Sequence, residues 1–287
     1  MKNLFKLLGI IAIAAVIGFG IAACGGGDDT DNDDGTNNGG SNSGGNTGGN
    51  NTGDNNNSGT ATLTLSGKVY LESYNEENDT VTYTPYSGSH PVENYRYSDS
   101  YVYVNNGGTG SITNGNLTFV IGTPSGFDNE SILSQFTSGY NNLQISNGDV
   151  KSSLLDLRIP GGQYNYDIGH LYRGKYEGNV SGNTESSSDE VVGYVYVDRD
   201  VTISGKGTTT TNSGEYEDEE GNVINYTGTT TTKDINITLK TGWNAIYSNE
   251  EETGTLTGNT GTYTETLTYS MVIPDNLYWT LHLAAFE

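Results

Sequence analysis

Apolar and polar side chains alternate along much of the chain after residue 60, and this period of two is typical of half-buried β-strands. The alternation is clear in residues 63–71 and 235–240. A third such segment places Leu277, Trp279, Leu281 and Leu283 on one face. Residues 61–287 contain Ala only four times but hold all 21 Tyr of the chain, and aromatic and β-branched residues favour strands. We therefore expect an all-β protein whose core is formed by these apolar faces.

Turn residues mark where several strands end. Asn114-Gly115 lies between two strand-like segments and predicts a hairpin, because both central residues of a type I′ turn need a positive φ. Asp198-Arg199-Asp200 predicts a second tight turn, and turn-forming preference explains its residues without a functional role.

A long, polar hairpin is expected near the middle of the second half. Residues 207–211 and 228–232 are identical tracts, each one Gly followed by four Thr, and they flank an acidic tip at residues 215–220. Strands of this composition should be exposed to water on both faces. The tip is best interpreted as a solvated turn, with weak calcium binding as the alternative.

The folded part divides, on this interpretation, into two pieces near Pro160-Gly161-Gly162. We expect one or two antiparallel β-sandwich units of immunoglobulin or transthyretin type, with residues 61–160 as the first and 161–287 as the second. One short helix is predicted over residues 127–136, where apolar residues have near-helical spacing and Ser125 or Asp128 could cap the first turn.

Residues 25–60 contain only Gly, Asn, Asp, Thr and Ser. A segment without apolar side chains cannot offset the entropy cost of ordering, so residues 24–60 should form a flexible tether. Its root-mean-square span would be about 33 Å.

The N-terminus has the layout of a secretory signal peptide over residues 1–23. Lys2 and Lys6 flank the start of an apolar stretch, which ends in Ile21-Ala22-Ala23-Cys24. This ending resembles the lipobox of bacterial lipoproteins, and the resemblance implies that Cys24 is lipidated with acyl chains such as palmitate and becomes the first residue after cleavage. The alternative is an uncleaved transmembrane anchor.

Both interpretations place the rest of the chain outside the cytoplasm, because the lysines precede the apolar run. Gly25 follows the Cys where the inner-membrane retention pattern has Asp, so we expect an outer-membrane location, on either the periplasmic or the surface-exposed face. The formal net charge of −23, from 12 basic and 35 acidic residues, argues against nucleic acid as a partner.

No familiar catalytic motif occurs in the sequence, and we expect no catalytic residue, cofactor or metal site. There is no Gly-x-Ser-x-Gly motif and no phosphate-binding loop. The three histidines, at positions 90, 170 and 282, lack the spacing of a local zinc site. His282 is expected to be exposed and His90 to lie in a loop. Paired carboxylates could hydrolyse glycans, but sequence spacing alone cannot identify such a pair.

Tyrosine is the most suggestive residue type, because aromatic rings on an exposed sheet can stack on sugars. The candidates are Tyr95, Tyr97, Tyr101, Tyr103, Tyr164, Tyr166, Tyr194 and Tyr196. The alternative, which we favour, is that these rings cover the sheet and form cross-strand pairs. Trp243 and Trp279 are expected in the core of the second unit.

As a whole the chain resembles uncharacterised β-rich surface lipoproteins of bacteria. The resemblance implies a protein attached to the membrane through lipid on Cys24, with a glycan or a surface protein as its partner. We expect a non-enzymatic surface module for binding, adhesion or scaffolding. The alternative is a glycan-binding or glycan-hydrolysing enzyme that uses paired carboxylates.

Overall fold

The computed structural model describes residues 59–75, 80–97, 103–128, 139–161, 169–217 and 221–283. These residues form strands and connecting loops, and none of them is helical, so the all-β expectation is confirmed. The strands are β1 (Leu63–Asn75), β2 (Thr80–Pro85), β3 (His90–Tyr97), β4 (Tyr103–Asn105), β5 (Thr109–Thr113), β6 (Asn116–Ile121), β7 (Tyr140–Ile145), β8 (Ser152–Leu154), β9 (Leu157–Ile159), β10 (Gly169–Ser181), β11 (Thr184–Val197), β12 (Val201–Gly207), β13 (Thr209–Glu217), β14 (Val223–Thr232), β15 (Ile235–Leu239), β16 (Gly242–Thr257), β17 (Thr260–Ser270) and β18 (Tyr278–Leu283).

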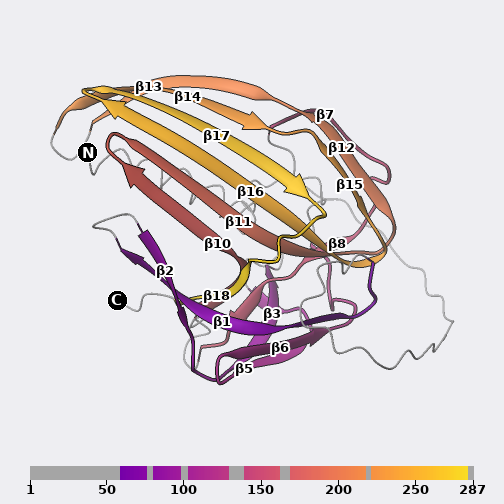
Figure 1. Cartoon of the computed structure of the whole chain (residues 1–287). Helices are drawn as coiled ribbons and strands as arrows, with labels where there is room; N and C mark the ends of the chain where they lie inside the picture. Colours follow the sequence, from indigo (N-terminus) through magenta and orange to yellow (C-terminus); the bar gives the residue numbers. More distant parts are fainter. Residues whose placement is uncertain are drawn as a thin grey trace.

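Most strands belong to one large sheet, with the order β13-β14-β17-β16-β11-β10-β18-β1-β6-β5-β3-β4 and with β2, β8 and β9 paired beside this path (Figure 1). A second sheet has the order β15-β12-β7. The pairing is mainly antiparallel, but β1 with β18 and β14 with β17 are parallel. The large sheet is therefore mixed rather than purely antiparallel.

The alternation in the sequence predicts the buried faces well. In β15, Ile235, Ile237 and Leu239 are buried while the residues between them are exposed. Leu277, Trp279 and Leu281 are also buried, but Leu283 is 39% exposed. Its assignment to the core face is wrong, because it lies at the end of β18, where the apolar packing stops.

The Asn114-Gly115 hairpin is confirmed. These two residues have φ values of 48° and 72° and join β5 to β6, with Thr113 opposite Asn116. Glycine is required at the second position for space as well, because a Cβ atom at Gly115 would lie 1.8 Å from the carbonyl oxygen of Tyr86.

The connection at residues 198–200 is as short as expected, but the strands that it joins do not pair with each other. β11 lies in the large sheet and β12 in the second sheet. The Asp198 Oδ1 atom accepts a hydrogen bond from Lys151 N, and Asp200 Oδ1 accepts one from Thr241 N. These two carboxylates fix the place where the chain passes from one sheet to the other.

The long polar hairpin is confirmed as β13 paired with β14, in the register that brings the two threonine tracts together. β13 is exposed along almost its whole length, as expected, whereas β14 buries Ile224, Gly228 and Thr232. Residues 218–220 of the acidic tip lie outside the described residues.

Two apolar cores lie on opposite faces of the large sheet. In β11, Val192 and Tyr194 belong to the first core, whereas Val195 and Val197 belong to the second. The first core consists of Leu63, Leu65, Val69, Val92, Ile112, Leu117, Phe119, Ile121, Leu157, Ile159, Leu171, Val192, Tyr194, Trp243, Ala245, Ile273, Leu277, Trp279 and Leu281. The second consists of Val150, Val195, Val197, Val201, Ile203, Ile235, Ile237, Leu239 and Ile246.

Both tryptophans are buried, as predicted, but the core that holds them also contains residues from before residue 160, among them Leu63 and Phe119. Strands from the two sides of that boundary are hydrogen-bonded in one sheet, β1 to β18 and β9 to β10. The division into two units stays a prediction.

Several other expectations concern residues that the structure does not describe. They are the signal peptide at residues 1–23, Cys24, almost all of the tether, and residues 129–136 of the expected helix. Asp128 is described: its Oδ2 atom accepts a hydrogen bond from Leu154 N in β8. Within the described ranges, no helix has the length and apolar character needed to span a membrane.

Candidate functional site

Six long strands continue the large sheet beyond the two cores. They are β10, β11, β16, β17, β14 and β13, and they run side by side in the upper part of Figure 1. Their outer halves are rich in Thr, Ser, Glu and Gly, so no large apolar cluster forms there. We call this part of the sheet the extension.

Strand register determines which side chains share a face of the extension. Asp189 in β11 lies directly opposite Glu250 in β16, and Glu252 lies opposite Glu265 in β17. Since alternate residues of a strand share a face, all four carboxylates lie on one face, and this is the side on which the second core lies further along β11.

The same face carries a row of tyrosines on β13, β14 and β17. The ring centroids of Tyr216 and Tyr226 are 6.3 Å apart, and those of Tyr226 and Tyr263 are 6.2 Å apart. We name the surface formed by Asp189, Glu250, Glu252, Glu265, Tyr216, Tyr226 and Tyr263 the acidic–tyrosine face.

Glycines make room for these rings. A Cβ atom at Gly228 would lie 1.9 Å from the ring of Tyr263, and one at Gly214 would lie 2.7 Å from the hydroxyl oxygen of Tyr226. Each ring therefore lies over a glycine of the neighbouring strand, an arrangement that protects the glycine backbone and holds the ring flat against the sheet.

Glu250 and Glu252 on this face have raised pKa values. Burial, then the charges of Glu265, Asp189 and Glu252, raise the pKa of Glu250 to about 8. Burial and Glu265 raise the pKa of Glu252 to about 7. Among the described positions that share this face, none is Lys or Arg, so no cation offsets the repulsion.

Asp189 adjoins a second polar group at the margin of the extension. Burial, then the charges of Glu72 and Glu190, raise the pKa of Asp189 to about 6. The Tyr172 hydroxyl donates a hydrogen bond to Glu72 Oε2, and burial beside this carboxylate raises the pKa of Tyr172.

A tyrosine side chain completes this margin. β18 stops pairing with β10 at Gly174, so the next backbone groups of β10 need another partner. The Tyr83 hydroxyl lies between the backbone N and O atoms of Tyr176, accepting from the first and donating to the second. Hydrogen bonds thus hold the side chains of Glu72, Tyr172 and Tyr83 in place, and we assign these residues a structural role.

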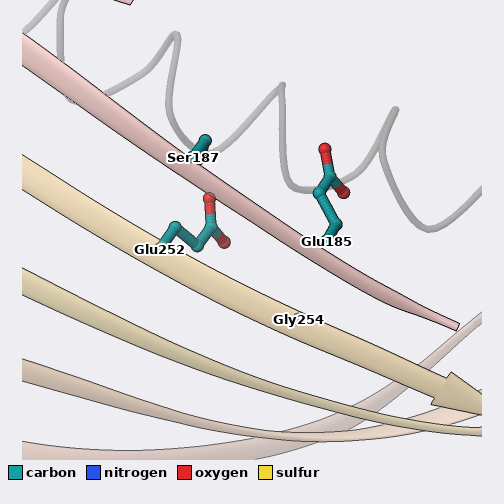
Figure 2. Close-up of a pocket in the computed structure, with 4 residues that line it drawn as sticks. All are labelled: Glu185, Ser187, Glu252 and Gly254. Atoms are coloured by element: carbon teal, nitrogen blue, oxygen red, sulfur yellow. The ribbon is translucent and has the colours of Figure 1, made fainter. Parts of the chain in front are cut away.

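A small hollow lies on the same side of the sheet. Figure 2 shows Glu185 and Ser187 on one strand and Glu252 and Gly254 on the next, with the carboxylate of Glu252 beside Ser187. Its cavity volume is about 10 Å³, room for about one water molecule and far below the roughly 300 Å³ at which small-molecule sites begin. The arrangement therefore suits an extended ligand lying on the surface better than an enclosed small molecule.

Metal binding at this face finds no support in the geometry. Within the described part of the chain, no group of three or more His, Cys, Asp or Glu side chains is placed to hold a metal ion. The possible calcium site at the acidic tip stays untested, since residues 218–220 are outside the described ranges.

The three histidines are separated by the fold into two places. His170 lies opposite His282 in the pairing of β10 with β18, and His282 is exposed as expected. The His170 Nδ1 atom is 3.9 Å from Asp156 Oδ1. His90 begins β3 rather than lying in a loop, and its Nε2 atom is 2.7 Å from the Tyr86 hydroxyl.

The predicted tyrosine candidates do not form one platform. Tyr194 is buried and stacks on Trp279, while Tyr196 packs edge-on against Trp243. Tyr194 belongs to the first core, and Tyr196 is partly buried against it. Tyr103 is exposed, and its ring lies 3.5 Å from the Arg158 guanidinium.

The remaining candidates lie mostly elsewhere or outside the described residues. The Tyr95 hydroxyl donates to Glu93 Oε2. Tyr97 is in β3, opposite Tyr103 of β4. Residues 101, 164 and 166 are not described, and neither is Cys24.

The sequence-based candidates include none of the tyrosines of the acidic–tyrosine face. Part of its acidic half could have been found, because the run Asn249-Glu250-Glu251-Glu252 is visible in the sequence. A strand interpretation of that run puts Glu250 and Glu252 on one face. Their neighbours Asp189 and Glu265 could be found only from the register of strands that are distant in sequence.

Comparisons with known proteins return no relative: no family model, no curated protein and no solved structure matches this chain.

Proposed function

We propose that this protein is an exported, lipid-anchored binding module without enzymatic activity, and that it contacts its ligand through the acidic–tyrosine face. The observation that carries the proposal is the row of tyrosines beside four carboxylates on a sheet that extends beyond both cores. An extended surface of this kind suits adhesion or scaffolding better than the chemistry of an enclosed site.

The anchoring part rests on the signal-peptide layout and on Cys24 at the end of the lipobox-like segment. Several acyl chains, at about 0.8 kcal/mol for each buried CH2 group, hold a protein stably in a membrane. We expect palmitate labelling of the wild-type chain and none of the Cys24→Ser variant. Equal labelling of both would disprove lipidation at this residue.

We infer that the ligand is a neutral glycan displayed at a cell surface. Tyrosine rings can lie against the apolar faces of sugar rings, and carboxylates accept hydrogen bonds from sugar hydroxyl groups. The net charge of −23 disfavours acidic polysaccharides.

A glycan array with the full chain in detergent tests this inference. We expect the Tyr226→Ala variant to bind about three- to tenfold more weakly than wild type. Tyr103→Ala serves as the matched control, because this exposed tyrosine lies on β4, outside the extension. Equal losses for both variants, or no signal for any neutral glycan with the wild-type chain, would contradict the inference.

A glycan hydrolase is the second candidate, and the raised pKa of Glu250, about 8, favours it. A carboxyl group that keeps its proton near neutral pH can act as a general acid beside an ionised partner such as Asp189. Release of reducing sugar that is lost in the Glu250→Gln variant would support this function and count against the non-enzymatic proposal.

The finer fold class also belongs to the proposal. We infer that the part containing the cores is a β-sandwich, because the β15-β12-β7 sheet packs on β11 and β16 through the second core. The parallel pairs β1–β18 and β14–β17 make it a mixed variant of the expected antiparallel type.

A further inference from the structure

The strand β13 ends the order of the large sheet, and β14 is its partner there. It follows the rim of the extension at the top of Figure 1. Eight of its nine residues are exposed, and Tyr216 is the exception. Its outer edge therefore presents backbone groups to water along the length of the strand.

The register identifies the groups that point outward. Thr232 N donates to Thr208 O at 2.9 Å, so residues 208 and 232 form a hydrogen-bonded pair. Such pairs recur at every second residue of an antiparallel ladder, so Thr210 and Asn212 also bond to β14. The outward N–H and C=O groups belong to the odd-numbered residues Thr209, Thr211, Ser213, Glu215 and Glu217.

This edge has few of the devices that usually prevent strands from pairing, since its only charged residues, Glu215 and Glu217, lie at one end. β13 contains no Lys, Arg or Pro, and its register with β14 is continuous, without a bulge. Nine residues span roughly 30 Å, which is long for an exposed edge.

We propose that β13 pairs antiparallel with β13 of a second copy of this chain, about a two-fold axis at Ser213, so that the two large sheets become one. In this register Thr211 of each copy faces Glu215 of the other, and Thr209 faces Glu217. Every outward backbone group of both strands then has a partner.

The charges within β13 favour the antiparallel direction over the parallel one. Antiparallel pairing places the acidic end of one strand beside the neutral threonine end of the other, whereas parallel pairing in register would place Glu215 opposite Glu215. Within β13 carboxylates lie only at residues 215 and 217, so a basic peptide would be matched along part of the strand, whereas a second copy pairs every outward backbone group.

The pairing also enlarges the binding surface of the proposed function, although it does not depend on that function. A two-fold axis perpendicular to the sheet keeps each face on the same side in both copies. The two acidic–tyrosine faces would therefore be continuous, with the Tyr216 side chains near the join.

Two lysine variants with the same change in net charge test the register. Sedimentation of the full chain in detergent should show a dimer at concentrations on the order of 100 µM, since an edge-to-edge contact is small. Ser213→Lys puts two lysines opposite each other at the axis and should weaken the dimer about fivefold. Thr211→Lys places each lysine opposite Glu215 and should strengthen it by a similar factor.

The double variant Thr211→Lys with Glu215→Lys is the control, because lysine then faces lysine and the dimer should again be weaker than that of wild type. A wild-type chain that stays monomeric up to about 500 µM would overturn the proposal. The proposal would also be overturned if Ser213→Lys and Thr211→Lys shifted the dimer dissociation constant in the same direction. Binding of a basic peptide to this edge, without dimer formation, would overturn it as well.

Discussion

The Glu250 carboxyl group faces three other acids, and its charge opposes folding. Its pKa of about 8 in the folded protein is above the value of about 4.3 in an unfolded chain. The folded state therefore binds this proton more tightly, and the stability that it contributes is complete below about pH 4. That stability is lost as the pH rises from about 4 to 8.

We expect the Glu250→Gln variant to be more stable than wild type at pH 8, by about 1–3 kcal/mol after allowance for partial exposure to solvent. At pH 4 the difference should nearly vanish. Urea unfolding at both pH values measures it. Glu251→Gln is the matched control, because Glu251 is exposed on the opposite face of β16. A pH-independent difference for Glu250→Gln would show that burial and the neighbouring charges do not raise the pKa of Glu250 in the folded protein.

Glycine at position 228 is needed for the tyrosine row. An added Cβ atom would lie 1.9 Å from the Tyr263 ring, so we expect Gly228→Ala to cost about 1–3 kcal/mol of stability. Gly193→Ala should be neutral or slightly stabilising, because its Cβ atom would meet only Ile246 O, at 3.9 Å. Thermal unfolding of both variants measures this contrast. If Gly228→Ala were as stable as Gly193→Ala, the Tyr263 ring would have to move aside at little cost.

At the scale of strands, the sequence predicts what depends on neighbouring residues. The alternation in β15 and the Asn114-Gly115 turn determine a buried face and a hairpin locally, and both are confirmed. The path from β11 into the second sheet depends on side-chain contacts with residues such as Lys151 and Thr241, which are distant in sequence. For the same reason, the sequence could not place Asp189 opposite Glu250.

The β13–β14 hairpin allows a direct test of its hydrogen-bond pattern. Thr210→Pro removes an N–H group that bonds to β14, whereas Thr211→Pro removes one that points outward. We expect Thr210→Pro to destabilise the hairpin by about 1 kcal/mol or more relative to Thr211→Pro. Limited proteolysis within residues 209–232 would report this as faster cleavage of the first variant. The reverse order would mean that the register differs by one residue.

At the scale of the whole molecule, the ends of the described chain are joined. β1 pairs with β18, and the first core takes Leu63 and Phe119 from one side of residue 160 and Trp243 and Trp279 from the other. Neither side can expose its apolar face without breaking the same core. This arrangement opposes independent folding of the two units that the sequence predicts.

We therefore expect both sides of residue 160 to unfold together. Hydrogen exchange with mass spectrometry across a denaturant series should show peptides from residues 103–128 and 242–257 losing protection at the same midpoint. Leu281→Ala should shift both midpoints by the same amount, corresponding to a loss of about 2–5 kcal/mol, because Leu281 is fully buried between them. Two separate midpoints, with only the second moved by Leu281→Ala, would instead support two independent sandwich units. The large sheet would then be a contact between domains that each have a core of their own.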